Sequence, residues 1–174
     1  MRVVLSLADV ILDTTEMYRA GIAARVVDKL AYSEQQALIN ALFEPIEVAL
    51  SRGDFFNEKL ISSLNSFDQE NVEYFIVCTP TEETLGYRIA DLVRDRYQLH
   101  IADVYSQYFE DTEEYLAEIG VDMIITNDKY LLTSACGVVP ELVCYGMHEV
   151  SLPLSFTTDS AVVGKRIAEY LENS

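Results

Sequence analysis

Short apolar runs that alternate with amphipathic segments constrain the fold of this chain more than any other feature. Five runs have the length and apolar character of buried strands: Arg2–Leu7, Val72–Thr79, Leu99–Val104, Val121–Thr126 and Leu142–Tyr145. Between the later runs, apolar residues recur with the period of a helix. One example is the set Leu85, Ile89, Leu92 and Val93. Strands that alternate with such helices predict a parallel sheet with helices on both faces.

The connections between these runs predict how the strands are arranged. Right-handed crossovers and short connections favour a Rossmann-like, five-stranded α/β sheet in the order 3-2-1-4-5. The section from 14 to 65 lacks strand-like alternation, so we expect it to be mostly helical and to lie above the strand ends. The predicted domains are an α/β core formed by 1–13 and 66–174 and a small helical cap formed by 14–65.

Polar residues follow three of the predicted strands. The three strand tips read Ser6-Leu7-Ala8, Thr79-Pro80-Thr81 and Thr126-Asn127-Asp128. In open parallel sheets, ligands bind at the carboxyl ends of the strands, where the strand order reverses. We therefore expect a functional site to lie at these tips.

The first tip carries a recognisable pattern. It continues as Asp9-Val10-Ile11-Leu12-Asp13, and the whole segment resembles the first motif of the HAD-like (haloacid dehalogenase-like) phosphohydrolases. The resemblance implies that Ser6 stands at the position of the Asp nucleophile and Ala8 at that of the general acid/base. Asp9 then falls at the Gly position of the motif. The cap resembles in size that of 5'(3')-nucleotidase-like members.

Two later segments match further motifs of that family in the same order. The segment around Thr79 resembles the second motif, in which Thr79 would bind a phosphoryl oxygen. The segment that ends at Asp128 resembles the fourth motif, with Thr126 and Asn127 where the carboxylates that hold magnesium are expected. Asp128 remains as a weak candidate metal ligand. The family also needs a Lys between these motifs, and no Lys lies between Thr79 and Thr126.

These losses determine what the resemblance implies for function. A Ser hydroxyl without an adjacent base is a poor nucleophile, and Ala8 cannot protonate a leaving group. Magnesium prefers carboxylate ligands. We therefore expect a catalytically inactive HAD-like protein, without cofactor or bound metal, that acts by binding a protein or a ligand. The alternatives are a weak or divergent magnesium-dependent, nucleotidase-like phosphatase and an acidic interaction protein that mimics nucleic acid.

Local structure offers a simpler interpretation of several of these polar residues. Ser6 and Thr79 can satisfy backbone groups at strand ends. Asp13 is favoured as the N-cap of the first helix of the insertion. Asp128 near a helix start is stabilised by the helix macrodipole without any metal.

The formal net charge of −17 limits the classes of partner. A charge of this sign and size should repel nucleic acid and anionic membranes. No apolar run approaches the roughly 18 residues that a membrane span needs. We expect a cytoplasmic protein that binds a protein partner. A partner with a basic surface would be attracted to this negatively charged chain.

Cysteine and histidine add little chemistry. Cys78 and Cys144 lie in apolar runs and are expected to act as small core residues, whereas Cys136 does not. His100 begins the third strand and His148 follows the fifth, so the topology predicts that neither lies close to the tip of the first strand. No zinc-ligand spacing is present.

One predicted helix carries an acidic face. Its carboxylates recur at i, i+3, i+4 and i+8, and three tyrosines lie nearby: Glu110, Glu113, Glu114 and Glu118, with Tyr105, Tyr108 and Tyr115. A solvated helix face explains the glutamates most simply. If the chain binds a protein partner, this face with exposed tyrosines is our first candidate surface.

Overall fold

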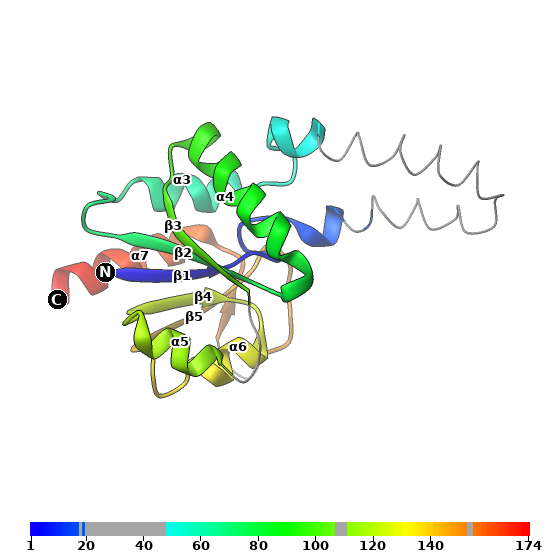
Figure 1. The fold of residues 1–174 in the computed structure, drawn as a ribbon. Helices are drawn as coiled ribbons and strands as arrows, with labels where there is room; N and C mark the ends of the chain where they lie inside the picture. The colour runs from blue at the N-terminus through cyan, green and yellow to red at the C-terminus, as the bar shows by residue number, and fades with distance from the viewer. Residues whose placement is uncertain (18, 20–47, 107–110, 153–154) are drawn as a thin grey trace.

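A six-stranded parallel sheet forms the centre of the molecule (Figure 1). The structure, a computed structural model, describes residues 1–17, 19, 48–106, 111–152 and 155–174. The strand order is β3-β2-β1-β4-β5-β6, and every neighbouring pair is parallel. The strands are β1 (Arg2–Ser6), β2 (Glu73–Cys78), β3 (Ile101–Ser106), β4 (Met123–Thr126), β5 (Glu141–Tyr145) and β6 (Phe156–Thr157). The predicted order 3-2-1-4-5 is confirmed, and β6 is added at one edge.

Helices cover both faces of this sheet, as predicted (Figure 1). One face is covered by α3 (Glu58–Asn65), α4 (Glu83–Tyr97) and α7 (Ser160–Asn173), and the 3-10 helix η2 (Pro80–Glu82) leads into α4. The other face is covered by α5 (Thr112–Glu118) and α6 (Lys129–Ala135). Within the described ranges, no helix has both the length and the apolarity to cross a bilayer.

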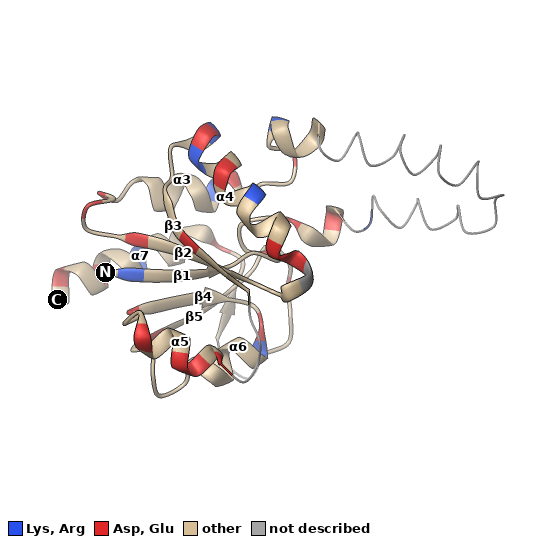
Figure 2. Cartoon of the chain, viewed as in Figure 1, with Lys and Arg blue, Asp and Glu red and all other residues tan. Residues whose placement is uncertain are grey.

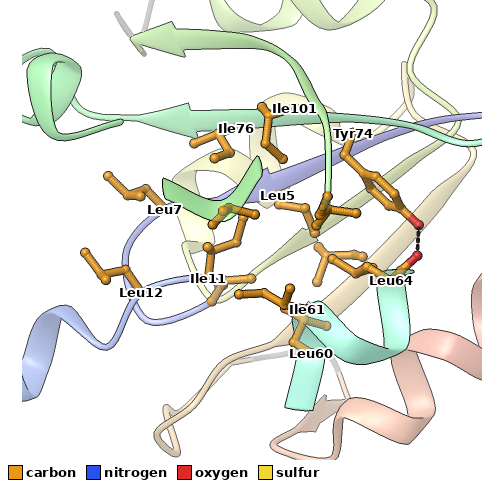
Figure 3. Close-up of a cluster of buried hydrophobic side chains, with 14 of the residues drawn as sticks. Leu5, Leu7, Ile11, Leu12, Leu60, Ile61, Leu64, Tyr74, Ile76 and Ile101 are labelled. Carbon is orange, nitrogen blue, oxygen red and sulfur yellow. Dashed lines mark hydrogen bonds between the residues drawn. The ribbon is translucent and has the colours of Figure 1, made fainter. Parts of the chain in front are cut away.

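The side chains of β1 enter two cores because the strand is central and buried on both faces. Leu5 joins the cluster under α3, α4 and α7, whereas Val4 joins the cluster under α5 and α6. Figure 3 shows the larger cluster, in which Leu5 and Ile76 from the sheet lie near Ile61 from α3. A fully buried aliphatic side chain contributes about 1.5–3 kcal/mol, so this cluster fixes α3 on the sheet.

The structure places helix α3 in the core, whereas the sequence pattern placed it at the C-terminal end of the cap. Residues 58–65, which the sequence pattern placed in the cap, bury Leu60, Ile61 and Leu64 in the core and pack beside α7 and α4. The Tyr74 hydroxyl on β2 donates to the Leu64 carbonyl oxygen at 2.8 Å and holds the end of the helix. A helical period predicts a helix but not the surface that it covers. The predicted cap residues 20–47 lie outside the described residues.

Candidate functional site

The tips of β1 and β4 bring together two of the predicted site residues. Ser6 and Thr126 end these strands, and their hydroxyl oxygens Oγ and Oγ1 are 2.5 Å apart in a hydrogen bond. Ser6 is 7 % exposed and Thr126 is fully buried. Thr126 Oγ1 also accepts the Asp128 backbone N–H at 3.0 Å. The hydroxyls therefore bond to each other and to the chain, and no charge lies on either.

Asp128, the weak candidate metal ligand, caps α6. Its carboxylate accepts the Tyr130 N–H at 2.8 Å. Asp128 is thus the N-cap, and the helix begins at Lys129. Asn127 instead packs against Gly146, where an added Cβ would lie 3.1 Å from the Asn127 amide nitrogen. Both residues of the predicted fourth motif are engaged in local structure.

The second strand tip is also used for helix formation. Thr79 is exposed and is the N-cap of η2, with a capping box that includes the Glu82 carboxylate. The Thr79 N–H donates to this carboxylate at 3.4 Å. Ala8, the other predicted position, is half-buried and forms an isolated bridge with Leu12.

Asp9 organises the loop that follows β1. Its backbone is left-handed, with φ of 55°, which is uncommon for residues other than Gly. Its carboxylate accepts hydrogen bonds from Thr14 Oγ1 at 3.1 Å, Thr15 N at 2.9 Å and Thr15 Oγ1 at 2.6 Å. Its carbonyl oxygen accepts the Met147 N–H at 2.7 Å. Asp9 therefore joins the first loop to the segment after β5.

His148, which the topology predicted to lie elsewhere, also joins the segment after β5 to the first loop. His148 Nε2 lies 2.8 Å from Asp13 Oδ1, so the prediction that His148 lies away from this end of the first strand is wrong. The hydrogen bond to Asp13 is the main cause that raises the pKa of His148, with partial burial opposing it. Asp13 also accepts the Glu16 N–H at 3.0 Å, which confirms its predicted role as an N-cap.

The loop after β1 and the segment after β5 together bring three side chains close enough to ligate a metal ion. One ligand atom from each of Asp9, Asp13 and His148 lies within 4.8 Å of the others. Hydrogen bonds within the chain already engage each of these groups. The cluster is thus explained as a link between two segments that are far apart in sequence.

The acidic face differs in part from the prediction. Glu113, Glu114 and Glu118 on α5 are exposed, as expected. Tyr105 and Tyr115 are half-buried and stack on each other, with ring centroids 3.8 Å apart and planes at 6°. Burial is the main cause that raises the pKa of Tyr115 to about 12.

These tyrosines pack into the core beside α5 and α6 because their rings bury apolar area. They therefore differ from the exposed tyrosines that the sequence pattern predicted. Glu110 and Tyr108 lie outside the described residues.

Two of the three cysteines lie in the core of the molecule. All three are free; Cys78 and Cys144 are buried, as predicted, and Cys136 is exposed. Burial raises the pKa of the Cys78 thiol to about 11, with Glu82 and Glu83 adding to the shift. The thiolate is the reactive form, so Cys78 is not a nucleophile at neutral pH.

A groove beside the start of α3 was not predicted from the sequence. It has a volume of about 690 Å³ and is lined by residues from several elements, including Arg52, Asn57, Lys59, Arg96, Met147 and Ser160. Asn57 is buried and its amide donates to the Val10 carbonyl oxygen and the Tyr145 hydroxyl, both at 2.8 Å. Because these residues are scattered through the sequence, no local motif marks the groove.

The sequence was also compared with known proteins. No protein-family model matches the chain, and a search of curated proteins finds no match.

Proposed function

We propose that this chain is a catalytically inactive, HAD-like protein that acts by binding rather than by phosphoryl transfer. The observation that carries the proposal is the hydrogen bond between Ser6 and Thr126. In the resembled family, carboxylates at these positions attack the phosphorus atom and hold magnesium. A buried pair of neutral hydroxyls does neither, because it supplies no nucleophilic charge and no carboxylate ligand.

The conformation of the first loop supports the resemblance on which the proposal rests. Asp9 stands at the Gly position of the first motif, and its φ of 55° is one that Gly adopts without strain. Asp13 stands at the last Asp of the motif and begins a helix by accepting the Glu16 N–H.

The remaining catalytic positions support inactivity. The methyl group of Ala8 cannot donate a proton to a leaving group. Asp128 holds the first turn of α6 through the Tyr130 N–H and thus has a local role without metal. The interval between Thr79 and Thr126 contains no Lys to offset charge on a phosphoryl group. Electrostatic stabilisation of this kind is typically worth several kcal/mol.

A phosphatase assay tests the proposal. The purified chain is incubated with magnesium and with p-nitrophenyl phosphate or nucleoside monophosphates, and released phosphate is measured. We expect no release above the background of an EDTA control, because nucleophile, acid and metal ligands are missing together. Release that rises in proportion to protein concentration and stops in EDTA would contradict the proposal.

Restoring the two missing carboxylates sharpens this test. In the double variant Ser6→Asp, Ala8→Asp we expect weak magnesium binding by calorimetry, with turnover still near background because the Lys remains absent. The matched control Ser6→Asn, Ala8→Asn changes the same positions without adding charge and should bind no magnesium. Equal magnesium binding by both variants would show that the restored carboxylates are not the ligands.

A further inference from the structure

The groove beside the start of α3 differs in charge from the rest of the molecule. The chain carries a net charge of −17, and Figure 2 shows acidic residues without basic ones on α5 and a mixture of both on α4. The groove nevertheless has three basic side chains, Arg52, Lys59 and Arg96, against two acidic ones, Asp54 and Glu58. The local balance is positive, which favours an anion.

The acidic side chains of the groove already have partners. Asp54 accepts a hydrogen bond from Arg52 at 2.7 Å, and Glu58 accepts one from the Tyr97 hydroxyl at 2.9 Å. Lys59 is exposed and forms no ion pair with a residue of the described part of the chain. Lys59 and Arg96 are therefore the cations that remain for a ligand.

Arg96 is held in position before any ligand binds. Its Nε donates to the Tyr97 hydroxyl at 3.3 Å, and its guanidinium lies 5.6 Å from the centre of the Tyr97 ring. Gly53 makes room for it, since a Cβ on Gly53 would lie 2.5 Å from Arg96 Nε. A cation fixed in this way loses less entropy on binding than a free side chain does.

Hydroxyl donors face the same groove from the start of α7. Thr158 and Ser160 line it, and Ser160 is the first residue of this 14-residue helix. Helix N-termini favour negative charge. The Asp159 carboxylate is engaged with the Ala161 N–H at 3.0 Å. Cations and hydroxyls thus meet around one space.

We propose that this groove binds a small organic dianion, whose charged group is held by Lys59 and Arg96 and by the hydroxyls at the start of α7. The volume of about 690 Å³ exceeds that of an inorganic anion and lies within the range of small-molecule sites. A phosphate monoester and a dicarboxylate share the required chemistry. This inference rests on the proposed binding function and names the class of its ligand.

Calorimetry on the whole chain tests the inference with four probes. AMP, glucose 6-phosphate and the dicarboxylate malate carry the anionic groups on an organic body, and inorganic phosphate does not. We expect at least one organic probe to bind at one site, more tightly than inorganic phosphate, and less tightly as salt is added. Preference for the esters or for malate identifies the source of the dianion. Absence of binding by all three organic probes, or tighter binding of inorganic phosphate, overturns the inference.

Two variants and a matched control locate the site. Lys59→Gln should weaken binding of the preferred probe by about tenfold or more, as expected for loss of a charge-assisted contact. Lys165→Gln removes the same charge from an exposed site on α7, outside the groove, and should leave binding unchanged. Gly53→Ala should weaken binding by displacing Arg96. Binding that is unaffected by Lys59→Gln overturns the assignment to this groove.

Phosphate release is measured in the same ester samples, which separates the two proposals. Binding that depends on Lys59 without release of phosphate supports both. Magnesium-dependent release would contradict catalytic inactivity while the Lys59 comparison still decides the groove.

Discussion

Ser6 and Thr126, at the tips of β1 and β4, are buried and bonded to each other, whereas Lys59 and Arg96 line an open groove beside α3. The first pair occupies the place where an open parallel sheet is expected to bind a ligand. Its polar atoms are already satisfied, so it offers little to a ligand. The groove has no such topological signature but retains charge that the chain does not neutralise. Within the described residues, the groove therefore offers a ligand charge that is not compensated by an ion pair, whereas the two strand tips offer none.

The largest effect should follow from placing a charge at the strand tips. Ser6→Asp puts a carboxylate beside the buried Thr126 hydroxyl, and we expect the free energy of unfolding to fall by about 3–5 kcal/mol, as for an uncompensated buried charge. Urea unfolding at neutral pH measures it. Ser6→Ala, which loses only a neutral hydrogen bond, should cost about 1 kcal/mol. If the two variants are equally stable, water reaches Ser6 and the contrast with the groove fails.

Asn57 links the groove to the loop after β1 and to the end of β5, and its loss should have the next largest effect. Asn57→Ala removes two buried hydrogen bonds and the N-cap of α3, so we expect unfolding to become easier by about 2–3 kcal/mol. Asn57→Asp keeps the cap but buries a carboxylate against the Val10 carbonyl oxygen, so it should lower the free energy of unfolding by at least as much as Asn57→Ala does. Denaturant unfolding of the three proteins gives the order. If Asn57→Ala leaves the free energy of unfolding unchanged, the hydrogen bonds of Asn57 do not stabilise the fold.

The link between His148 and Asp13 should give a smaller, pH-dependent effect. The pKa of His148 is raised above its usual 6.5 in the folded state. Its stabilisation is therefore fully present below pH 6.5 and is lost as pH rises through the folded-state pKa. The His148 side chain is 38 % exposed, so we expect about 0.5–1 kcal/mol for this pair.

The variant His148→Gln isolates this contribution. Its stability should differ from wild type at about pH 5.5 and approach it at about pH 8.5, where histidine is neutral. Both proteins are unfolded in urea at each pH, so other titrating groups cancel in the difference. A difference that is the same at both pH values would contradict a charged His148.

The smallest effect is expected on the acidic face of α5. Replacing Glu114 and Glu118 by Lys changes two exposed residues, so the free energy of unfolding should change by no more than about 0.5 kcal/mol. If a basic protein partner binds this face, the reversal should slow association and flatten its salt dependence. Stopped-flow association at two salt concentrations measures both. An unchanged rate would leave the face as solvated surface.

The features predicted correctly from sequence are those that depend on periodic burial. The apolar residues of β1 and β4 predict strands buried on both faces, and short connections predict their order. Strand β6 was missed because two residues are too few to show a period. The role of α3 was mistaken because Leu60 and Leu64 predict an amphipathic helix without indicating which surface it buries.

The candidate sites were predicted less well, for a different physical reason. The hydrogen bond of Ser6 follows from two strand tips that the topology places side by side. Arg96 and Lys59 meet only through the packing of α3 against α4, and Gly53 lets Arg96 approach. His148 reaches Asp13 because Met147 bonds to Asp9. Contacts of this kind depend on loop paths, which have no periodic pattern.

The central position of β1 also has a consequence for synthesis of the chain. Arg2 on β1 pairs with Glu73, which is 71 residues away, and its backbone N–H bonds to Asp122, 120 residues away. At roughly 5–20 residues per second on the ribosome, the first strand emerges well before either neighbour. Its apolar side chains therefore lack one strand neighbour until β2 has been made and the other until β4 has been made. Such a segment is a natural target for a chaperone, and its exposure to aggregation ends only when β4 has been made.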